Sequence, residues 1–394
     1  MSDKIFDGPS VRMVAGPAGR AAAGGANPLR FWGMTGRQRL ERSLVRAGVS
    51  AASPEPPPPD RGLLLIRDDY IFDEMLIPAL LRQPGILLTG IDGEPVAAHL
   101  AKPVEAAQAT KIEAALASGA AASFDAAELR RVDSAGLAST YNKTLRRRSP
   151  PYLMRVDSMP PVTIERRMFD GAYKGVTDFV TKRVWPWPAF RVTRFCARFG
   201  ITPNMVTAVS LVLVLLAMLF FWRGQFGFGL VCAWGMCFLD TVDGKLARVT
   251  LTSTPFGNIF DHGIDLIHPP FWYWAWYHGL AGADDLTMLA LIVILVGYVG
   301  GRLQEGLFTL LHGIEIHIWR PLDSWFREIT ARRNPNLFIL SVAVLLDAPR
   351  EGFLAVAAWT ILSFVFHTIR IVQASFAKAM GRAPTSWLRE PIAS

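Results

Sequence analysis

Four aspartates lie close together in a stretch of the chain that has apolar sequence on both sides. Asp240 and Asp243 stand three positions apart, and Asp261 and Asp265 stand four positions apart. On a helix, residues at these spacings share one face. Two facing helices that carry the two pairs would therefore bring four carboxylates to one point.

Such a group of carboxylates needs compensation, because the charges repel one another and lose hydration in partly apolar surroundings. Divalent metal is the usual compensation, and all-oxygen ligands suit hard ions such as Mg²⁺ and Mn²⁺. We predict a site for two ions, since two ions bridged by carboxylates can hold a diphosphate and activate a hydroxyl. Separate ion pairs are the alternative, which we disfavour because no nearby surplus of bases could neutralise all four aspartates.

Small residues accompany the aspartates. Gly244 and Ala247 fall on the helix face of the first pair, as does Arg248, and Gly257 falls on the face of the second pair. Residues with little or no side chain would allow a ligand to come close.

The whole stretch resembles the signature of the CDP-alcohol phosphotransferase family. Each fixed position is present at the family's spacing: Asp, two residues, Asp-Gly, two residues, Ala-Arg, eight residues, Gly, three residues, Asp, three residues, Asp. The resemblance implies that Asp240, Asp243 and Asp261 bind metal. It implies that Asp265 binds metal and also takes the proton from the acceptor alcohol.

The same resemblance implies residues for the CDP-linked substrate. Gly244, Arg248 and Thr254 would contact or lie near the CDP group. A Thr-Pro-Asn element before the first membrane helix would add contacts from Pro203, Asn204, Met205 and Val206. A proline at a helix start leaves free backbone N–H groups that suit an anion. A plain helix cap is the alternative, and both can hold together.

The predicted reaction is attack of an acceptor hydroxyl on the β-phosphorus of a CDP-linked substrate, with release of CMP. We predict a phosphatidyltransferase of phospholipid biosynthesis that uses CDP-diacylglycerol. A phosphorylated acceptor could be bound by arginines, whose forked donors match phosphate oxygens. The same arginines could equally be positive-inside anchors; they are Arg302, Arg327, Arg332 and Arg333.

Other functions compete with this one. A variant of the same chemistry uses a CDP-inositol-type polyol made by a cytidylyltransferase activity of the front domain. A protein of another class, an intramembrane cation transporter, could use the aspartates as an ion path. Gly244 and Arg248 argue against the transporter, because a cation path needs neither a cytidine-sized notch nor a fixed arginine. The intact set of aspartates argues against a catalytically dead scaffold.

The apolar residues that must position this site are unevenly placed along the 394 residues. The chain is rich in Ala, Gly and Pro before about residue 160, and after residue 202 it contains long runs with almost no charge. We predict an all-α polytopic membrane domain of six transmembrane helices at 203–380 and a small α/β cytoplasmic domain at 1–150. A basic, aromatic-rich amphipathic segment at 151–202 would lie on the membrane surface between them; an ordinary solvated linker is the alternative.

The predicted spans are 206–222, 226–247, 255–277, 286–310, 337–346 and 353–372, with a polar loop at 311–336. Basic residues flank the signature and the C-terminus, so both termini and the active site should face the cytoplasm from the inner membrane. The N-terminus has no apolar signal-peptide core.

A net charge of +8 suits anionic lipid or phosphates. It does not indicate a nucleic-acid binder, because the bases flank the spans. The family resemblance suggests a homodimer.

The front domain alternates short apolar runs with helical patches. We expect residues before about 60 to be weakly structured except for a helix at 35–48. Strands should follow at 62–67 and on both sides of Asp92-Gly93, and helices at 73–81, 103–117 and 125–131. The order resembles a nucleotidyltransferase-like domain, with a glycine loop at 15–20 and Asp68-Asp69 in place of its metal aspartate. The glycine spacing departs from that pattern and no lysine follows, which favours a degenerate, structural or regulatory domain over a catalytic one.

Overall fold

The structure, a computed structural model, describes residues 8–18, 29–49, 58, 60–120 and 129–389. The chain divides into two compact units. The first contains Met1–Asn142, Arg148–Ala172 and Val249–Leu251, and the second contains Lys143–Arg147, Tyr173–Arg248 and Thr252–Ser394. Each unit is described by itself below.

The first unit is built on a five-stranded mixed sheet. Its strand order is β1-β2-β5-β4-β6, with β1 and β2 parallel, β4 and β6 parallel, and β5 antiparallel to both of its neighbours. The strands are β1 (Ser10–Val14), β2 (Leu63–Arg67), β4 (Ile86–Thr89), β5 (Pro95–Leu100) and β6 (Arg130–Val132). The expected Asp92-Gly93 turn joins β4 to β5, and Gly93 adopts the left-handed φ of +75° that such a turn requires.

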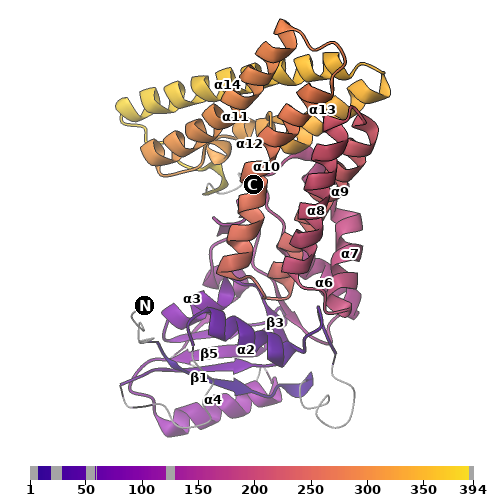
Figure 1. Ribbon diagram of the computed structural model, residues 1–394. Helices are drawn as coiled ribbons and strands as arrows, with labels where there is room; N and C mark the ends of the chain where they lie inside the picture. Colours follow the sequence, from indigo (N-terminus) through magenta and orange to yellow (C-terminus); the bar gives the residue numbers. More distant parts are fainter. Residues whose placement is uncertain (1–7, 19–28, 50–57, 59, 121–128, 390–394) are drawn as a thin grey trace. The chain divides into compact units, whose positions relative to one another are not determined.

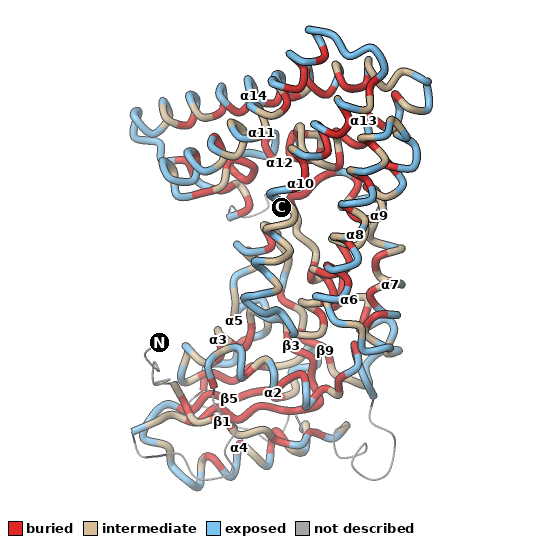
Figure 2. The backbone as a smooth tube through the Cα atoms, in the orientation of Figure 1, coloured by how far each residue is buried: buried red, intermediate tan, exposed pale blue. Residues whose placement is uncertain are grey.

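Helices cover both faces of this sheet (Figure 1). One face carries α2 (Gly36–Arg46), α3 (Leu76–Arg82) and α5 (Ser134–Leu137), and the other carries α4 (Ala106–Ser118). Strand β2 is buried on both sides, because Leu64 and Ile66 join the first core and Leu63 and Leu65 join the second. This explains its unbroken apolar sequence, and Figure 2 shows the central strands buried along their length.

The remaining elements in the sequence before about residue 172 are short. Strand β3 (Tyr70–Phe72) pairs antiparallel with β9 (Leu153–Arg155). The structure also contains β7 (Tyr141–Asn142), β8 (Arg147–Arg148) and α6 (Pro161–Gly171).

The second unit is helical. Its long helices are α8 (Pro203–Trp222), α9 (Phe226–Val249), α10 (Pro255–Gly279), α11 (Asp285–His312) and α14 (Pro349–Ala379). Shorter helices are the π-helix η2 (Val180–Val184), α7 (Pro186–Arg198), η3 (Ile316–Ile318), α12 (Pro321–Ile329), α13 (Arg333–Leu345) and η4 (Trp387–Arg389).

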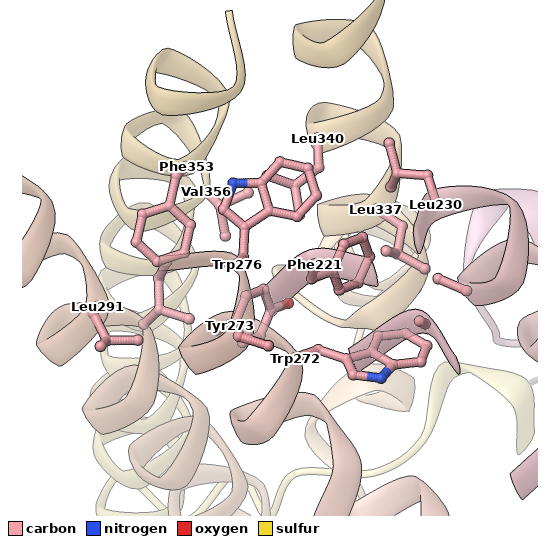
Figure 3. Packing of buried hydrophobic residues seen from close by; sticks show 14 of the residues in the cluster. Phe221, Leu230, Trp272, Tyr273, Trp276, Leu291, Leu337, Leu340, Phe353 and Val356 are labelled. Carbon is pink, nitrogen blue, oxygen red and sulfur yellow. The ribbon is translucent and has the colours of Figure 1, made fainter. Parts of the chain in front are cut away.

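An aromatic core holds the long helices together (Figure 3). Trp272 and Trp276 of α10 pack on Phe221 of α8, with ring centroids 6.0 Å and 5.0 Å apart. Gly279 ends α10 directly against α8: a Cβ there would lie 1.9 Å from the carbonyl oxygen of Phe221. The aromatic C-terminal half of α10 therefore contributes two tryptophans to the helix core.

Four of these helices, α8, α9, α11 and α14, are long and apolar enough to cross a membrane. The protein is thus an integral, multi-pass membrane protein. Helices α10 and α13 do not belong to these four. Helix α10 carries two of the signature aspartates, and α13 is only 13 residues long.

Several expected elements are confirmed. Helix α2 begins after Thr35, which caps it, and Gly48 follows its end with a φ of +94°. Helices stand at all six positions where spans were predicted.

Three expectations about elements were wrong. Residues 10–14, taken as weakly structured, form β1, because pairing with β2 supplies hydrogen bonds that a short segment lacks alone. The polar loop at 311–336 contains η3, α12 and the start of α13. Arg130 and Arg131 pair with β4 as a strand, not a helix; residues 125–128 of that expected helix lie outside the described residues, as does most of the proline-rich stretch at 54–60.

Candidate active site

Helices α9 and α10 bring three of the four signature aspartates together. One carboxylate oxygen from each of Asp240, Asp261 and Asp265 lies within 4.8 Å of the other two. Asp240 comes from α9 and the other two come from α10, one turn apart. The helical spacing read from the sequence accounts for this convergence.

Asp243, one turn after Asp240, has a different environment. Its Oδ2 accepts a hydrogen bond of 2.7 Å from Oγ1 of Thr207 on α8. Its Oδ1 is buried and has no hydrogen-bond partner among the described residues. A buried carboxylate oxygen without a partner is costly, so this atom is available to a ligand.

A guanidinium lies between two members of the cluster. The side chain of Arg333, at the start of α13, contacts the carboxylates of both Asp240 and Asp265. From the sequence, Arg333 was expected to be an acceptor ligand or a membrane anchor, and no base was expected so close to the aspartates. No sequence pattern could predict this contact, because Arg333 lies far from both aspartates in the sequence.

The donor set fits a divalent cation. All of its ligand atoms are carboxylate oxygens, which hard cations prefer. Asp240, Asp261 and Asp265 could hold a metal ion, and the unpartnered Oδ1 of Asp243 is a fourth candidate ligand.

A cavity of about 470 Å³ opens on the cluster. Asp240, Asp261 and Asp265 line it, and Asp243 does not. The structure brings to this same cavity all four arginines singled out for the acceptor: Arg302, Arg327, Arg332 and Arg333.

A second cavity of about 120 Å³ shares part of its lining with the first. Asp243 and Asp261 line it, together with most of the residues expected near the CDP group: Pro203, Asn204, Gly244, Arg248 and Thr254. Met205 and Val206 are not part of the lining that the structure describes; Met205 is exposed and Val206 is buried. Thr202 caps α8 by accepting a hydrogen bond from the Met205 amide, which agrees with the plain helix cap.

Two glycines of the signature have different surroundings. A Cβ on Gly244, which lines both cavities, would meet only the Nη2 atom of Arg248, at 3.6 Å. A Cβ on Gly257 would lie 2.6 Å from Oδ1 of Asn204. Gly244 thus leaves room for a ligand, whereas the close neighbour of Gly257 is a side chain of α8.

Comparison with known proteins agrees with this geometry. The family model of CDP-alcohol phosphatidyltransferase matches residues 200–323. Archaetidylinositol phosphate synthase of Pyrococcus horikoshii is 31% identical over 197 residues, which cover 49% of this chain and 94% of that protein. The chain belongs to the CDP-alcohol phosphatidyltransferase family.

A second relative matches a smaller part of the chain. Cholinephosphotransferase 1 of Xenopus laevis is 30% identical over 120 residues, which cover 26% of this chain and 27% of that protein. As a family member, the protein is an enzyme that transfers a substituted phosphate group from a CDP-alcohol to an acceptor.

The wall of the larger cavity also contains residues that the sequence analysis did not assign to the site. Arg146, Lys174 and Asp178 precede the matched region and line the cavity. Burial raises the pKa of Asp178, but the charge of Arg327 and hydrogen bonds from Thr181 and Asn334 outweigh burial and lower the pKa overall. Burial, followed by the charge of Arg332, lowers the pKa of Arg327 to about 9.

Two residues behind the cavity wall, Glu305 and His317, support Arg332. The carboxylate of Glu305 contacts the guanidinium of Arg332 and lies 3.2 Å from Nε2 of His317. Burial lowers the pKa of His317 to about 3, so its imidazole is neutral. These contacts hold Arg332 in place and could not be read from the sequence, because the three residues come from three separate elements.

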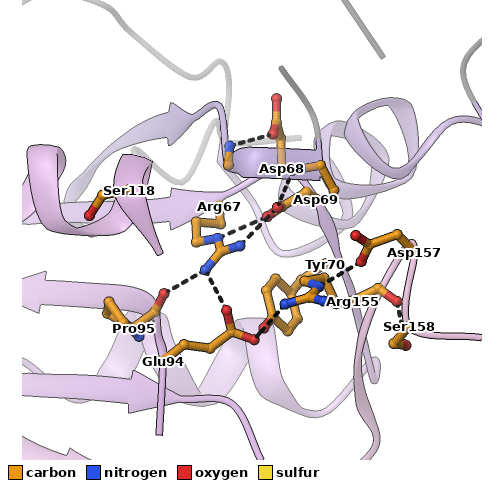
Figure 4. Close-up of polar contacts among 12 residues, drawn as sticks. Arg67, Asp68, Asp69, Tyr70, Glu94, Pro95, Ser118, Arg155, Asp157 and Ser158 are labelled. Carbon is orange, nitrogen blue, oxygen red and sulfur yellow. Dashed lines mark hydrogen bonds and ion pairs between the residues drawn. The ribbon is translucent and has the colours of Figure 1, made fainter. Parts of the chain in front are cut away.

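The candidate metal aspartates of the front unit are engaged with protein groups (Figure 4). Arg67 donates to both oxygens of Asp69, at 2.9 and 2.8 Å, and is buried. The amides of Gly16 and Ala18 donate to Asp68 and Asp69. The rest of the predicted glycine loop, including Gly19 and Arg20, lies outside the described residues.

Proposed function

We propose that the enzyme transfers a phosphatidyl group from CDP-diacylglycerol to a hydroxyl of a phosphorylated polyol, with release of CMP. The observation that carries the proposal is the lining of the larger cavity, which contains the aspartate cluster and more basic than acidic side chains. Such a surplus of positive charge favours an acceptor that carries its own phosphate.

Asp265 is the proposed base. The family resemblance implies this role for it, and Asp265, like Asp240, lines the larger cavity and not the smaller one, whereas Asp261 lines both. An acceptor in the larger cavity would therefore have its hydroxyl next to the Asp265 carboxylate. The carboxylate takes the hydroxyl proton, the oxygen forms a bond to the β-phosphorus, and the bond from that phosphorus to the oxygen of CMP breaks.

The donor would occupy the smaller cavity. Gly244 leaves space beside the helix backbone, and Arg248 offers positive charge to the nucleotide phosphates. Pro203, Asn204 and Thr254 complete that wall. Met205 and Val206, also proposed to contact the donor, follow them at the start of α8.

The residues proposed to hold two divalent ions, Mg²⁺ or Mn²⁺, are Asp240, Asp243, Asp261 and Asp265. When bound, such ions neutralise the diphosphate and polarise its oxygens.

The acceptor is proposed to be an inositol phosphate or a similar polyol phosphate. The relative from Pyrococcus horikoshii is named archaetidylinositol phosphate synthase, and the inositol phosphate in that name supports this choice. The four candidate arginines line the acceptor side.

The membrane arrangement is proposed to have six spans, with α10 and α13 added to the four apolar helices. Helix α7 exposes Trp187 and Phe195, and Phe199 is exposed directly after it. The guanidinium of Arg191 lies 4.3 Å from the Trp187 ring centroid. These features suit a helix on the membrane surface. We propose that both termini and the active site face the cytoplasm from the inner membrane, and that the protein is a homodimer as its family resemblance suggests.

The front unit is proposed to be structural or regulatory and not a cytidylyltransferase. The amides of Gly16 and Ala18 already donate to carboxylates, and Arg67 occupies both oxygens of Asp69. Full-length protein supplied with CTP and inositol phosphate should release no pyrophosphate. Release of pyrophosphate would instead support the CDP-polyol variant.

The main test supplies purified protein with labelled CDP-diacylglycerol, Mg²⁺ or Mn²⁺, and one acceptor at a time. Inositol phosphate, glycerol phosphate, serine and inositol form the panel. CMP release should depend on a phosphorylated acceptor. Equal release with inositol and inositol phosphate would contradict the proposal.

A further inference from the structure

Arg327 is a buried cation without a hydrogen-bonded partner on the larger cavity. Its side chain is 8% exposed, and its Nε and Nη1 atoms make no hydrogen bond in the part of the chain that the structure describes. Asp178 also lines the cavity, but its carboxylate accepts from the Thr181 amide at 3.0 Å and from Nδ2 of Asn334 at 2.9 Å. Burying a guanidinium without hydrogen bonds or an ion pair costs free energy unless an anion binds to it.

Lys174 is a second cation on the same wall. Within the described residues it makes neither an ion pair nor a hydrogen bond through its ammonium. Burial, followed by the charges of Arg248 and Arg146, lowers its pKa. The lysine thus lies mainly among like charges and, as with Arg327, no described carboxylate forms an ion pair with it.

The position of Lys174 is fixed by the backbone next to it. The amide of Gly175 donates a 2.8 Å hydrogen bond to the carbonyl of Leu145. A Cβ on Gly175 would lie 2.5 Å from the carbonyl oxygen of Arg146, so the two segments are in direct contact. Arg146 itself is paired with Glu315 at 2.8 Å. The contact at Gly175 therefore holds Lys174 on the wall, and the charge of Arg146 is already matched.

The charges around the cavity favour one kind of ligand. Its acidic residues are Asp178, Asp240, Asp261 and Asp265, and its basic residues are Arg146, Lys174, Lys245, Arg248, Arg302, Arg327, Arg332 and Arg333. Two of these cations, Lys174 and Arg327, have neither an ion pair nor a hydrogen-bonded carboxylate in the described structure. A phosphate monoester, with up to two negative charges and three acceptor oxygens, would complement both.

We propose that Lys174 and Arg327 together bind the phosphate of the acceptor, which rests on the proposed function above. Lys174 lies before residue 200, where the family match begins. The segment that precedes the family region is thus part of the acceptor site and helps to decide which alcohols the enzyme accepts.

The test compares acceptors that differ only in the phosphate. Initial rates are measured for wild type, Lys174→Met, Lys174→Arg and Lys182→Met with inositol phosphate against inositol, and with glycerol phosphate against glycerol. Lys182 is the matched control, because it lies in the same segment, pairs with Glu328 at 2.6 Å and does not line the cavity. Melting temperatures with and without CDP report whether each variant folds and keeps its nucleotide site.

The expected result is a fall of about 10- to 100-fold in kcat/KM for the phosphorylated acceptor in Lys174→Met. The KM of CDP-diacylglycerol should stay unchanged, Lys174→Arg should recover most of the activity, and Lys182→Met should resemble wild type. The melting temperature of wild type should rise with inositol phosphate, and that rise should be lost in Lys174→Met.

Three outcomes would overturn the inference. If Lys174→Met prefers the phosphorylated acceptor as strongly as wild type, Lys174 does not bind that phosphate, although the proposed function stands. If the KM of CDP-diacylglycerol rises instead, the lysine serves the donor. If wild type itself uses both members of each pair equally, the proposed function fails and the inference fails with it.

Discussion

Replacing Arg333 by methionine should make the aspartate cluster bind a divalent cation more tightly. The guanidinium of Arg333 contacts Asp240 and Asp265, two of the three aspartates whose oxygens converge. Because a guanidinium and a metal ion would compete for the same oxygens, a cation must displace Arg333 from them in the wild type. Methionine has a similar length and removes the competitor.

The size of the effect follows from these contacts. A hydrogen bond between charged groups contributes about 1.5–3 kcal/mol, and Arg333 contacts two carboxylates. The side chains of Arg333, Asp240 and Asp265 are 16%, 20% and 36% exposed, so solvent screens part of the attraction. A combined contribution of about 2 kcal/mol corresponds to a dissociation constant for the cation that is about 30-fold lower in the variant.

The assay is a titration with Mn²⁺ in detergent without substrate, followed by electron paramagnetic resonance. Arg302→Met is the matched control, because Arg302 lines the same cavity but its ion-pair partner is Glu305, at 4.0 Å. Unchanged or weaker Mn²⁺ binding in a folded Arg333→Met variant would refute the competition. An equal gain in the control would show that only the general charge of the cavity matters.

Three further predictions concern single side chains. Asp265→Asn should lower turnover by about 10²–10⁴-fold while CDP still raises the melting temperature; loss of CDP binding would contradict the assignment of Asp265 as base. Thr207→Val removes the donor to the buried Asp243 carboxylate, so it should lower the free energy of unfolding by about 1–3 kcal/mol, with Thr207→Ser as the control in denaturation. Because the pKa of Lys174 is lowered, its charge is lost at a lower pH than that of a free lysine. The KM of inositol phosphate should therefore rise from that lower pH upward, and Lys174→Arg should not show this rise.

The sequence predicted those features of the site and the fold that depend on the periodicity of a single helix. The spacing of Asp240, Asp261 and Asp265 predicted their convergence, and the structure brings their oxygens within 4.8 Å. The hydropathy pattern located the long helices, because a span is a local property of the sequence. The cap of α2 at Thr35 was predictable for the same reason.

The parts that depend on distant packing could not be predicted. The bond from Thr207 to Asp243 depends on how α8 and α9 are rotated against each other, which no local pattern records. Arg333 reaches the aspartates from a helix that was taken in part for a loop. Lys174 was one base in a long basic stretch, and the contact of Gly175 with Arg146 is what makes it different. Strand β1 escaped notice because its partner is more than 50 positions away.

The shared boundary of the two cavities has a consequence for altering this enzyme. Among the lining residues that the structure describes, Gly244, Arg248, Asp261 and His262 belong to both cavities. Elsewhere the two walls come from different residues: Asn204 and Thr254 on one side, Lys174 and Arg327 on the other. Substitutions on the wall of one cavity can therefore change the specificity for one substrate without changing the binding of the other substrate. Evolution or an engineer could thus change the acceptor that the enzyme uses while the residues around the nucleotide stay the same.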